Sequence, residues 1–327
     1  MKAAWFESFG KAQQVIRIGE RPTPAAAAGE VLVRMKTSAV NPSDVKKRAG
    51  SSPALLDQGF VIPNSDGAGV IEAVGAGVPS SRIGERVWVY QAQHGRRSGT
   101  AAEYLAIDAR RAAPLPEPAG FEVGACLGIP VMTAHRCVFA DGPVDGQSLL
   151  VTGGAGRVGY YAIQWAKSAG ARVIATASRP EDERTCREVG ADAAVNHRQA
   201  GWGERVKAAN GGAPVDRVVE VEFGANLAEV LQCIGTGGTI ATYSSMQAPE
   251  PKLPFYRMMF MDLTVRMVLV YVMPEAAKQA AIADIGRYLS EGRLRHRIAH
   301  RLPLEDLARA NELVEQGELR GCVVVDI

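Results

Sequence analysis

The sequence from residue 149 to residue 167 reads LLVTGGAGRVGYYAIQWAK. A short apolar run, a glycine-rich turn and a segment with helical spacing of apolar residues predict a strand, a tight loop and a helix in that order. A second run rich in β-formers, RVIATA at residues 172–177, follows Gly170. Together these segments predict a strand–helix–strand unit of a parallel sheet.

The glycine spacing in the predicted loop indicates what this unit binds. The loop contains Gly153-x-x-Gly156-x-x-Gly159, and Gly154-x-Gly156-x-x-Gly159 also matches the pattern G-x-G-x-x-G. In that pattern one glycine makes the tight turn, one lets the backbone approach a pyrophosphate, and one lets the helix lie close to the strand. The helix N-terminus then presents backbone N–H groups to the phosphates. We predict a dinucleotide site; the alternative is a glycine-rich turn that binds nothing.

The residues after the second predicted strand discriminate between dinucleotides. NAD sites usually carry an Asp or Glu here, whereas this chain has Ser178 and Arg179. A hydroxyl and a guanidinium can bind a 2′-phosphate that a carboxylate would repel, so NADPH is the predicted cofactor. Glu181, Asp182 and Glu183 follow closely, and a small shift of register would bring one of them to the ribose. We interpret them as the acidic first turn of a helix that follows Pro180.

Length and composition define an ordinary globular chain. The 327 residues are 47% hydrophobic and 22% charged, enough for two domains with separate cores. The formal net charge of +2 provides no global basic field, so nucleic-acid binding is not expected. The five cysteines form no C-x-x-C pair, which favours reduced, buried thiols; they are Cys126, Cys137, Cys186, Cys233 and Cys322.

The first residues and the most apolar stretch indicate the expected cellular compartment. The first ten residues, MKAAWFESFG, lack the apolar region of a signal peptide, which makes the cytoplasm the expected compartment. The stretch from Phe255 to Met273 is interrupted by Arg257, Asp262 and Arg266, so no membrane span is expected.

The pattern of predicted elements changes along the chain. The first 110 residues predict a β-rich, partly barrel-like antiparallel domain, with a helix beginning near Ser43. From about residue 124 onward, helical stretches alternate with β runs, which predicts a parallel sheet with right-handed crossovers. A strand expected at 322–327 follows two amphipathic helices and is predicted to return to the N-terminal domain. The β runs are expected at 2–5, 15–18, 30–35, 69–74, 86–90, 194–196, 215–220, 239–243 and 264–271.

Several separate stretches resemble one family, the zinc-free, zeta-crystallin-like quinone oxidoreductases of the medium-chain dehydrogenase/reductase superfamily. Beside the glycine loop, the resembling stretches are AVNPSD at 39–44, DGAGVIEAVG at 66–75, IGERV at 83–87, GTAAEY at 99–104, IPVMTA at 129–134 and VNHR at 195–198. The resemblance implies an α/β chain with a central Rossmann domain, residues 124–267. A split, GroES-like catalytic domain would comprise residues 1–123 and 268–327.

The resemblance also indicates how the chemistry would differ from that of the zinc-dependent branch. Alcohol dehydrogenases of the superfamily place a zinc-ligand Cys and His where this chain has Asn41 and Ser65, which are poor zinc ligands. The four-cysteine structural zinc lobe is missing as well. We therefore expect no metal.

The family's cofactor contacts can be carried over onto matching positions. The family has a His or Tyr near the 2′-phosphate where this chain has His197, although an ordinary surface histidine is the alternative. Many relatives have a Lys where this chain has Asp182. Binding of the 2′-phosphate is therefore expected to depend more on Arg179. The implied cofactor residues are Gly153, Ala155, Gly156, Arg157, Val158, Gly159, Ser178, Arg179, His197, Asn226, Tyr243, Ser244 and Ser245.

Without a metal, hydrogen-bond donors must stabilise the oxygen that gains charge when a carbonyl substrate is reduced. The candidates are Asn41, Lys46 and Arg48, with a Tyr in many relatives at the position of Lys46. Asn41 can instead cap the turn before Pro42, and the basic residues can form a solvated helix face.

The implied function is transfer of a hydride from NADPH to a quinone or an α,β-unsaturated carbonyl. One alternative is a non-enzymatic NADPH-binding protein with a crystallin-like or RNA-associated role. Another is an alcohol dehydrogenase, which would need a metal or strong base that the sequence does not supply. The run 264–271 is a candidate edge strand, and we expect a homodimer that joins two sheets edge to edge.

Overall fold

The computed structural model describes residues 1–57 and 59–327, which divide into two compact units. Unit 1 comprises Met1–Ile129 and Ile282–Ile327, and unit 2 comprises Pro130–Ala281. The sequence places the domain limits after residues 123 and 267, whereas the limits of the units fall after residues 129 and 281.

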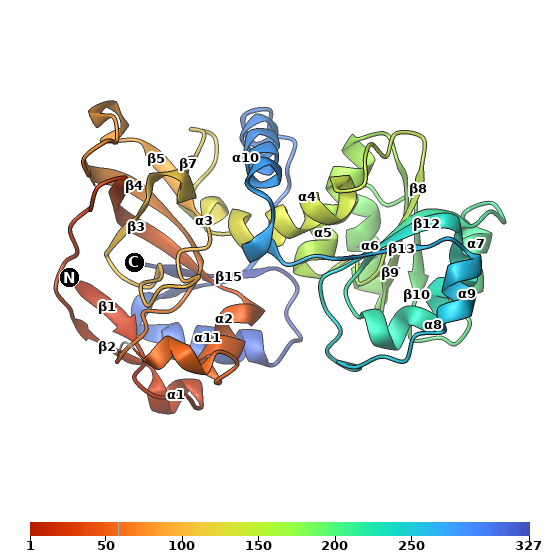
Figure 1. Cartoon of the computed structure of the whole chain (residues 1–327), viewed down its shortest axis with the longest axis horizontal. Helices are drawn as coiled ribbons and strands as arrows, with labels where there is room; N and C mark the ends of the chain where they lie inside the picture. Colours follow the sequence, from red (N-terminus) through yellow and green to blue (C-terminus); the bar gives the residue numbers. More distant parts are fainter. Residues whose placement is uncertain (58) are drawn as a thin grey trace. The chain divides into compact units, whose positions relative to one another are not determined.

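Unit 2 is built on a six-stranded sheet in which every pair of neighbouring strands is parallel. The strand order is β10-β9-β8-β11-β12-β13, which is 3-2-1-4-5-6 when the six strands are counted along the chain. Figure 1 labels five of these strands, β8, β9, β10, β12 and β13. This is the doubly wound Rossmann order, with the switch point between the first and fourth strands. The strands are β8 (Ser148–Val151), β9 (Arg172–Ala177), β10 (Ala193–Asn196), β11 (Val215–Glu220), β12 (Ile234–Thr242) and β13 (Thr264–Met267).

Apolar residues on the strands and on the crossover helices form the core of unit 2. Leu150, Ile174 and Val218 come from three neighbouring strands and are fully buried against side chains such as Trp202 and Leu231. The helices are α4 (Met132–Phe139), α5 (Arg157–Ser168), α6 (Pro180–Glu188), α7 (Trp202–Ala209), α8 (Phe223–Cys233) and α9 (Phe255–Phe260). The predicted strand–helix–strand unit is confirmed as β8, α5 and β9.

Unit 1 contains a mainly antiparallel sheet in the order β14-β15-β3-β4-β5-β7, with β6 also paired to β3. The predicted return of the C-terminal strand is confirmed, because Val323 to Asp326 of β15 pair with Val40 to Thr37 of β3. The strands are β3 (Glu30–Val40), β4 (Asp66–Val74), β5 (Arg86–Val89), β6 (Tyr104–Asp108), β7 (Ala112–Pro114), β14 (Ile298–Pro303) and β15 (Cys322–Asp326).

A two-stranded ribbon and short helices complete unit 1. The ribbon pairs β1 (Lys2–Trp5) with β2 (Arg17–Glu20). The helices are α1 (Ala12–Val15), α2 (Pro42–Arg48), α3 (Phe121–Gly124) and α11 (Leu307–Glu315), and α10 (Glu275–Ser290) contains the limit between the units. Short 3₁₀ turns lie at Pro53–Leu56, Ser80–Arg82, Ala109–Arg111, Val270–Val272 and Leu304–Asp306, and a π-helical turn at Leu127–Val131.

Several predicted strands differ in extent from the observed ones, and two of them run into helical turns. The strand expected at 15–18 begins at Arg17, because Ala12–Val15 forms a helical turn that buries Ala12 and Val15. The strand expected at 264–271 ends at Met267, opposite Thr242, the last residue of its partner β12. The Val268 N–H still donates to the Thr242 carbonyl over 2.7 Å, and the chain then turns into the 3₁₀ segment Val270–Val272.

The cysteine prediction is confirmed, since all five cysteines are buried and none of them forms a disulfide. Within residues 1–57 and 59–327, a search for a helix with the length and hydropathy of a membrane span finds none.

Candidate functional site

The glycine loop of unit 2 is held tightly against the second strand. The N–H of Gly153 donates to the Thr176 hydroxyl over 3.0 Å, and the N–H of Gly154 donates to the Thr176 carbonyl over 2.8 Å. Gly153 has a φ of +59°, in the left-handed region that favours glycine. The chain can therefore turn sharply from β8 into α5 while it stays bonded to β9.

The N-terminus of α5 has the features of an anion site. Gly156 is its N-cap and supplies no side-chain cap, and the first turn carries no acidic residue. A Cβ on Gly159 would lie 2.5 Å from the Gly153 carbonyl oxygen and 2.9 Å from the Gly154 Cα, so the first turn of α5 packs directly on the loop. Backbone N–H groups at an uncapped helix N-terminus bind phosphate, and this loop therefore fits the pyrophosphate of a dinucleotide.

The predicted residues for the adenosine end lie at the carboxyl ends of two adjacent strands. Ser178 and Arg179 follow β9, and His197 follows β10, whose Asn196 pairs with Ala177. The N–H of His197 donates to the Ala177 carbonyl over 3.1 Å. Arg179 is exposed and is the N-cap of α6, whose first turn holds Glu181, Asp182 and Glu183. The acidic run is thus the first turn of a helix, as predicted.

A buried carboxyl that the sequence analysis missed lies at the end of β11. Glu220 is fully buried, and its Oε1 accepts hydrogen bonds from the Thr152 hydroxyl (2.9 Å), the Asn226 amide (2.8 Å) and the Glu222 N–H. Burial raises the pKa of Glu220, while these three donors oppose the rise. A carboxylate residue at the end of a β run, just before a helix, is the signal that could have identified it.

This carboxyl organises several of the predicted cofactor residues. Asn226 of α8 is bonded to Glu220, and the Tyr243 N–H donates to the Glu220 carbonyl over 3.2 Å. The Ser244 carbonyl accepts from the Phe223 N–H, and the Ser245 hydroxyl accepts from the Gly224 N–H, both over 3.0 Å. Residues 243–245 are therefore fixed at the carboxyl edge of the sheet, where doubly wound folds bind their ligands.

A second polar cluster lies in unit 1 around the N-terminus of α2. Asn41 is the N-cap, and its side-chain amide donates to Asp66 Oδ2 over 2.9 Å. Its backbone N–H donates to Asp44 Oδ2 over 2.9 Å, and its side chain accepts from the Asp44 N–H, so Asn41 forms a capping box, the alternative role considered for it. Asp44 Oδ1 accepts from the Ser65 hydroxyl over 3.1 Å. The two positions that match zinc ligands elsewhere in the superfamily are thus joined through the Asp44 carboxyl, while Asp66 bonds to Asn41 alone of the two.

The basic residues of α2 have three different placements. Lys46 is exposed, whereas the Lys47 ammonium donates to the Gln93 carbonyl over 2.9 Å and to the Ser65 hydroxyl over 3.4 Å. Arg48 is 1% exposed; its guanidinium donates to the Gly10 carbonyl and pairs with Glu315 of α11 over 2.9 Å. These contacts make Arg48 a packing residue of unit 1, and we withdraw it from the catalytic candidates. Lys47 replaces it as the basic residue of the cluster.

Burial strongly perturbs the ionisation of this cluster. The pKa of Asp66 is raised well above its ordinary value, mainly by burial, and the neighbouring Asp44 raises it further. Burial also raises the pKa of Asp44, although Lys47 opposes the shift. The pKa of Lys47 is lowered by burial, while Asp44 and Asp66 act in the opposite direction. Carboxyls with raised pKa values and an ammonium with a lowered pKa are candidates for holding or transferring a proton.

We expect the free energy of unfolding to depend on pH through the ionisation of the buried Asp66. Because its pKa is raised on folding, its contribution to stability is complete below the ordinary aspartate pKa of about 3.9 and is lost as the pH rises through the raised value. Asp66→Asn keeps an acceptor for Asn41 and cannot ionise. Denaturant unfolding at a series of pH values should therefore show the variant gaining stability relative to the parent as the pH rises.

Asp108 provides the contrast for this experiment. Its pKa is lowered, chiefly by the Arg110 guanidinium, so Asp108→Asn should lose stability relative to the parent as the pH rises over the acidic range. Equal pH dependence of the parent and Asp66→Asn would show that Asp66 has no raised pKa.

No group of three or more His, Cys, Asp or Glu side chains with metal-binding geometry occurs in the part of the chain that the structure describes.

Two protein-family models and several known proteins match this chain. The model of the alcohol dehydrogenase GroES-like domain matches residues 27–117, and the model named zinc-binding dehydrogenase matches residues 158–285. The human quinone oxidoreductase is 30% identical over 320 residues, which cover 97% of this chain and 94% of that protein.

Solved structures agree with these matches. A mycobacterial protein in complex with NADPH has 27% identity and a TM-score of 0.87, and the match covers 100% of both chains. An NAD-dependent alcohol dehydrogenase has 29% identity and a TM-score of 0.88, again with 100% of both chains covered.

The GroES-like unit with its returning C-terminal strand and the Rossmann unit define a medium-chain dehydrogenase/reductase, an oxidoreductase that uses a nicotinamide cofactor. Within that superfamily, the chain belongs to the quinone oxidoreductase family.

Proposed function

We propose that the chain is an NADPH-dependent reductase of quinones or α,β-unsaturated carbonyls that works without a metal. The observation that carries the choice of cofactor is the placement of Ser178, Arg179 and His197 at the ends of adjacent strands. Arg179 is exposed and follows Ser178 just beyond the end of β9. It is therefore able to bind a 2′-phosphate with charge-assisted bonds.

The proposal that no metal takes part rests on the residues at the two zinc-ligand positions. The Asn41 amide is bonded to Asp66, and the Ser65 hydroxyl is bonded to Asp44 and Lys47. An amide and a hydroxyl are much weaker zinc ligands than imidazole and thiolate. Their hydrogen bonds to carboxyls and an ammonium suit a network that handles protons.

When bound, the reduced nicotinamide supplies the hydride. A quinone or enone that gains a hydride develops negative charge on its carbonyl oxygen and needs one proton to complete the reduction. We propose that Lys47 is the proton source, with Asn41 as a further hydrogen-bond donor. The lowered pKa of Lys47 makes its ammonium a stronger acid than an ordinary lysine, and Ser65 and Asp44 can resupply its proton.

We expect Lys47→Met to lower kcat by about tenfold to a hundredfold, the contribution typical of a positioned acid, while the dissociation constant of NADPH stays unchanged. Steady-state rates with a quinone and NADPH fluorescence titrations measure the two quantities. Lys46→Met is the matched control, because Lys46 is exposed on the same helix. A loss of kcat in the Lys46 variant alone would assign the role to Lys46 and refute it for Lys47.

The reductase activity is tested by following NADPH oxidation with a panel of quinones and enones. Turnover of at least one class supports the proposal. Tight NADPH binding without turnover across the panel would instead favour a non-enzymatic binding protein. Oxidation of alcohols with NADP⁺, without reduction of quinones, would favour an alcohol dehydrogenase.

We also propose that the chain forms a homodimer through the β13 edge of unit 2. β13 is the last strand in the described order of its sheet, and Met267 on it is 70% exposed. Large exposed apolar residues gather in the preceding helix α9, which contains Phe255, Tyr256, Met259 and Phe260. An apolar edge of this kind needs a partner to cover it.

Light scattering should give the mass of a dimer for the parent and that of a monomer for Met267→Lys, since a charge on the joined edge opposes pairing. Ile83→Lys, at an exposed apolar residue of unit 1, should remain dimeric. A monomeric parent at working concentration would contradict this assembly.

A further inference from the structure

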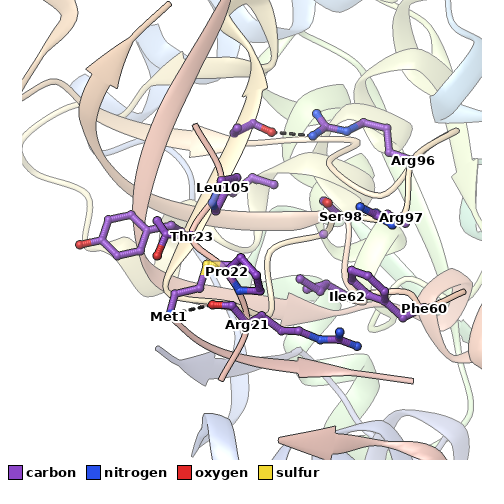
Figure 2. A pocket seen from close by; sticks show the side chains of 14 residues that line it. Met1, Arg21, Pro22, Thr23, Phe60, Ile62, Arg96, Arg97, Ser98 and Leu105 are labelled. Carbon is purple, nitrogen blue, oxygen red and sulfur yellow. Dashed lines mark hydrogen bonds between the residues drawn. The ribbon is translucent and has the colours of Figure 1, made fainter. Parts of the chain in front are cut away.

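Unit 1 contains a cavity separate from the Asn41 cluster. Its volume is about 370 Å³, within the range of small-molecule sites. Its wall is formed by residues 21–24, 96–99 and 104–106, together with Met1, Phe60 and Ile62. Figure 2 shows Arg21, Arg96 and Arg97 around this cavity, with Phe60 and Ile62 beside them.

The cavity wall carries a marked excess of positive charge. Arg21, Arg96 and Arg97 line it, whereas none of the described lining residues is Asp or Glu. The Nε of Arg21 is buried and has no hydrogen-bond partner among the described residues, although its terminal nitrogen lies 3.2 Å from Glu7. A buried donor of this kind is costly unless an acceptor reaches it.

Arg96 adds a partly desolvated charge. Burial lowers its pKa, and Arg111 lowers it further, whereas Glu30 and Asp108 oppose the shift. Its guanidinium donates to the Ala106 carbonyl over 2.5 Å, which anchors it at the cavity wall (Figure 2). An anion in the cavity would relieve this electrostatic cost.

The remaining lining is largely apolar. The Phe60 ring lies beneath two guanidinium groups, with its centroid 3.9 Å from the Arg21 Cζ and 4.5 Å from the Arg97 Cζ. Ile62 and Leu105 are 4% and 1% exposed and contribute aliphatic surface. The wall therefore offers cations for an acidic head group and apolar surface for a hydrocarbon or aromatic body.

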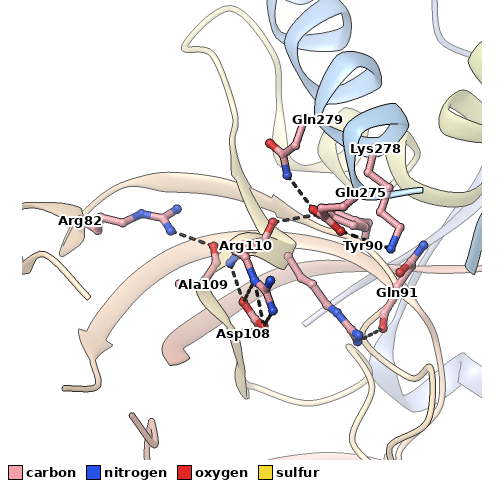
Figure 3. Close-up of polar contacts among 10 residues, drawn as sticks. Arg82, Tyr90, Gln91, Asp108, Ala109, Arg110, Glu275, Lys278 and Gln279 are labelled. Atoms are coloured by element: carbon pink, nitrogen blue, oxygen red, sulfur yellow. Dashed lines mark hydrogen bonds and ion pairs between the residues drawn. The ribbon is translucent and has the colours of Figure 1, made fainter. Parts of the chain in front are cut away.

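The loop that carries Arg96 and Arg97 is fixed by backbone contacts. The Gln93 amide donates to the Arg96 carbonyl over 3.1 Å, and the Arg97 carbonyl accepts from the Ile62 N–H over 2.8 Å. At the start of the loop, the Gln91 carbonyl accepts from Arg111 over 3.1 Å, next to the bond from the Tyr90 hydroxyl to the Arg110 carbonyl (Figure 3). The cavity is thus largely formed before a ligand arrives.

We propose that this cavity binds a small organic carboxylate with an apolar body. The planar guanidinium groups match a carboxylate through paired hydrogen bonds, and the apolar wall favours a carbon skeleton over an inorganic anion. The site is independent of the proposed reductase function, because it uses none of the residues assigned to the cofactor or to proton transfer.

The experiment titrates the full chain, without cofactor, with sodium benzoate as the probe and follows binding by calorimetry at low salt. We expect a dissociation constant on the order of 1 mM, and much weaker binding of neutral benzamide and of inorganic phosphate. Arg97→Gln and Arg96→Gln should each weaken benzoate binding about tenfold, the loss expected for one charge-assisted hydrogen bond.

Arg34→Gln is the matched control, because Arg34 pairs with Glu72 on the same unit and does not line the cavity. It should bind benzoate like the parent. Absent benzoate binding, equal affinity for benzamide, stronger binding of phosphate, or unchanged affinity in both cavity variants would each overturn the proposal. Parallel NADPH titrations of each variant keep this result distinct from that of the reductase proposal.

Discussion

Gly159→Ala is expected to weaken NADPH binding by about a hundredfold, which corresponds to roughly 3 kcal/mol of distortion in the loop. The added Cβ would lie 2.5 Å from the Gly153 carbonyl oxygen, and backbone cannot yield as a flexible side chain does. Either α5 moves away from the loop or the loop changes shape, and both displace the N–H groups that face the pyrophosphate. Fluorescence titration with NADPH measures the loss.

Gly286→Ala is the matched control for this substitution. A Cβ at Gly286 would meet no atom within 4 Å, and the residue lies inside α10. Alanine should therefore stabilise the chain by about 0.5–1 kcal/mol and leave NADPH binding unchanged. Thermal unfolding of both variants separates a local change in the loop from loss of the fold. A folded Gly159→Ala protein that binds NADPH like the parent would refute the assignment of the loop.

Arg179→Ala should weaken NADPH binding about tenfold or more and leave NADH binding unchanged, because only the 2′-phosphate distinguishes the two cofactors. The substitution should not disturb the fold, since the Arg179 side chain is exposed. Dissociation constants for both cofactors, in the parent and the variant, measure the effect.

Arg187→Ala is the control for charge alone. Arg187 is an exposed arginine in the last turn of the same helix, so its removal lowers the net charge equally. It should leave the NADPH preference of the parent intact. Equal affinity of the parent for NADPH and NADH would contradict the proposed role of Ser178, Arg179 and His197.

The parts of the fold that local patterns determine could be predicted. The order of apolar run, glycine turn and periodic helix predicts β8, α5 and β9 because each element depends on its own residues. Pro180 and the acidic residues after it predict the first turn of α6 for the same reason. Strand β14 escaped prediction, since the segment at 298–303 has a basic, only weakly apolar pattern and its pairing is set by β15.

The residues of the candidate site could be predicted only where local sequence fixes the backbone, as in the glycine loop. The side chains of α2 show the limit: Arg48 is directed into the unit by Glu315, which is 267 residues away in the sequence. Lys47 is identified by its bond to the Gln93 carbonyl, 46 residues away. Spacing along the helix cannot distinguish Lys46, Lys47 and Arg48, because contacts distant in sequence decide which of them is buried.

The central claim is that the chain reduces its substrate with NADPH and without a metal. The most direct test follows NADPH absorbance during reduction of a quinone by protein that has been dialysed against a strong chelator. We expect the rate to equal that of untreated protein and to remain unchanged when zinc is added. Loss of activity after chelation, with recovery on addition of zinc, would contradict the account.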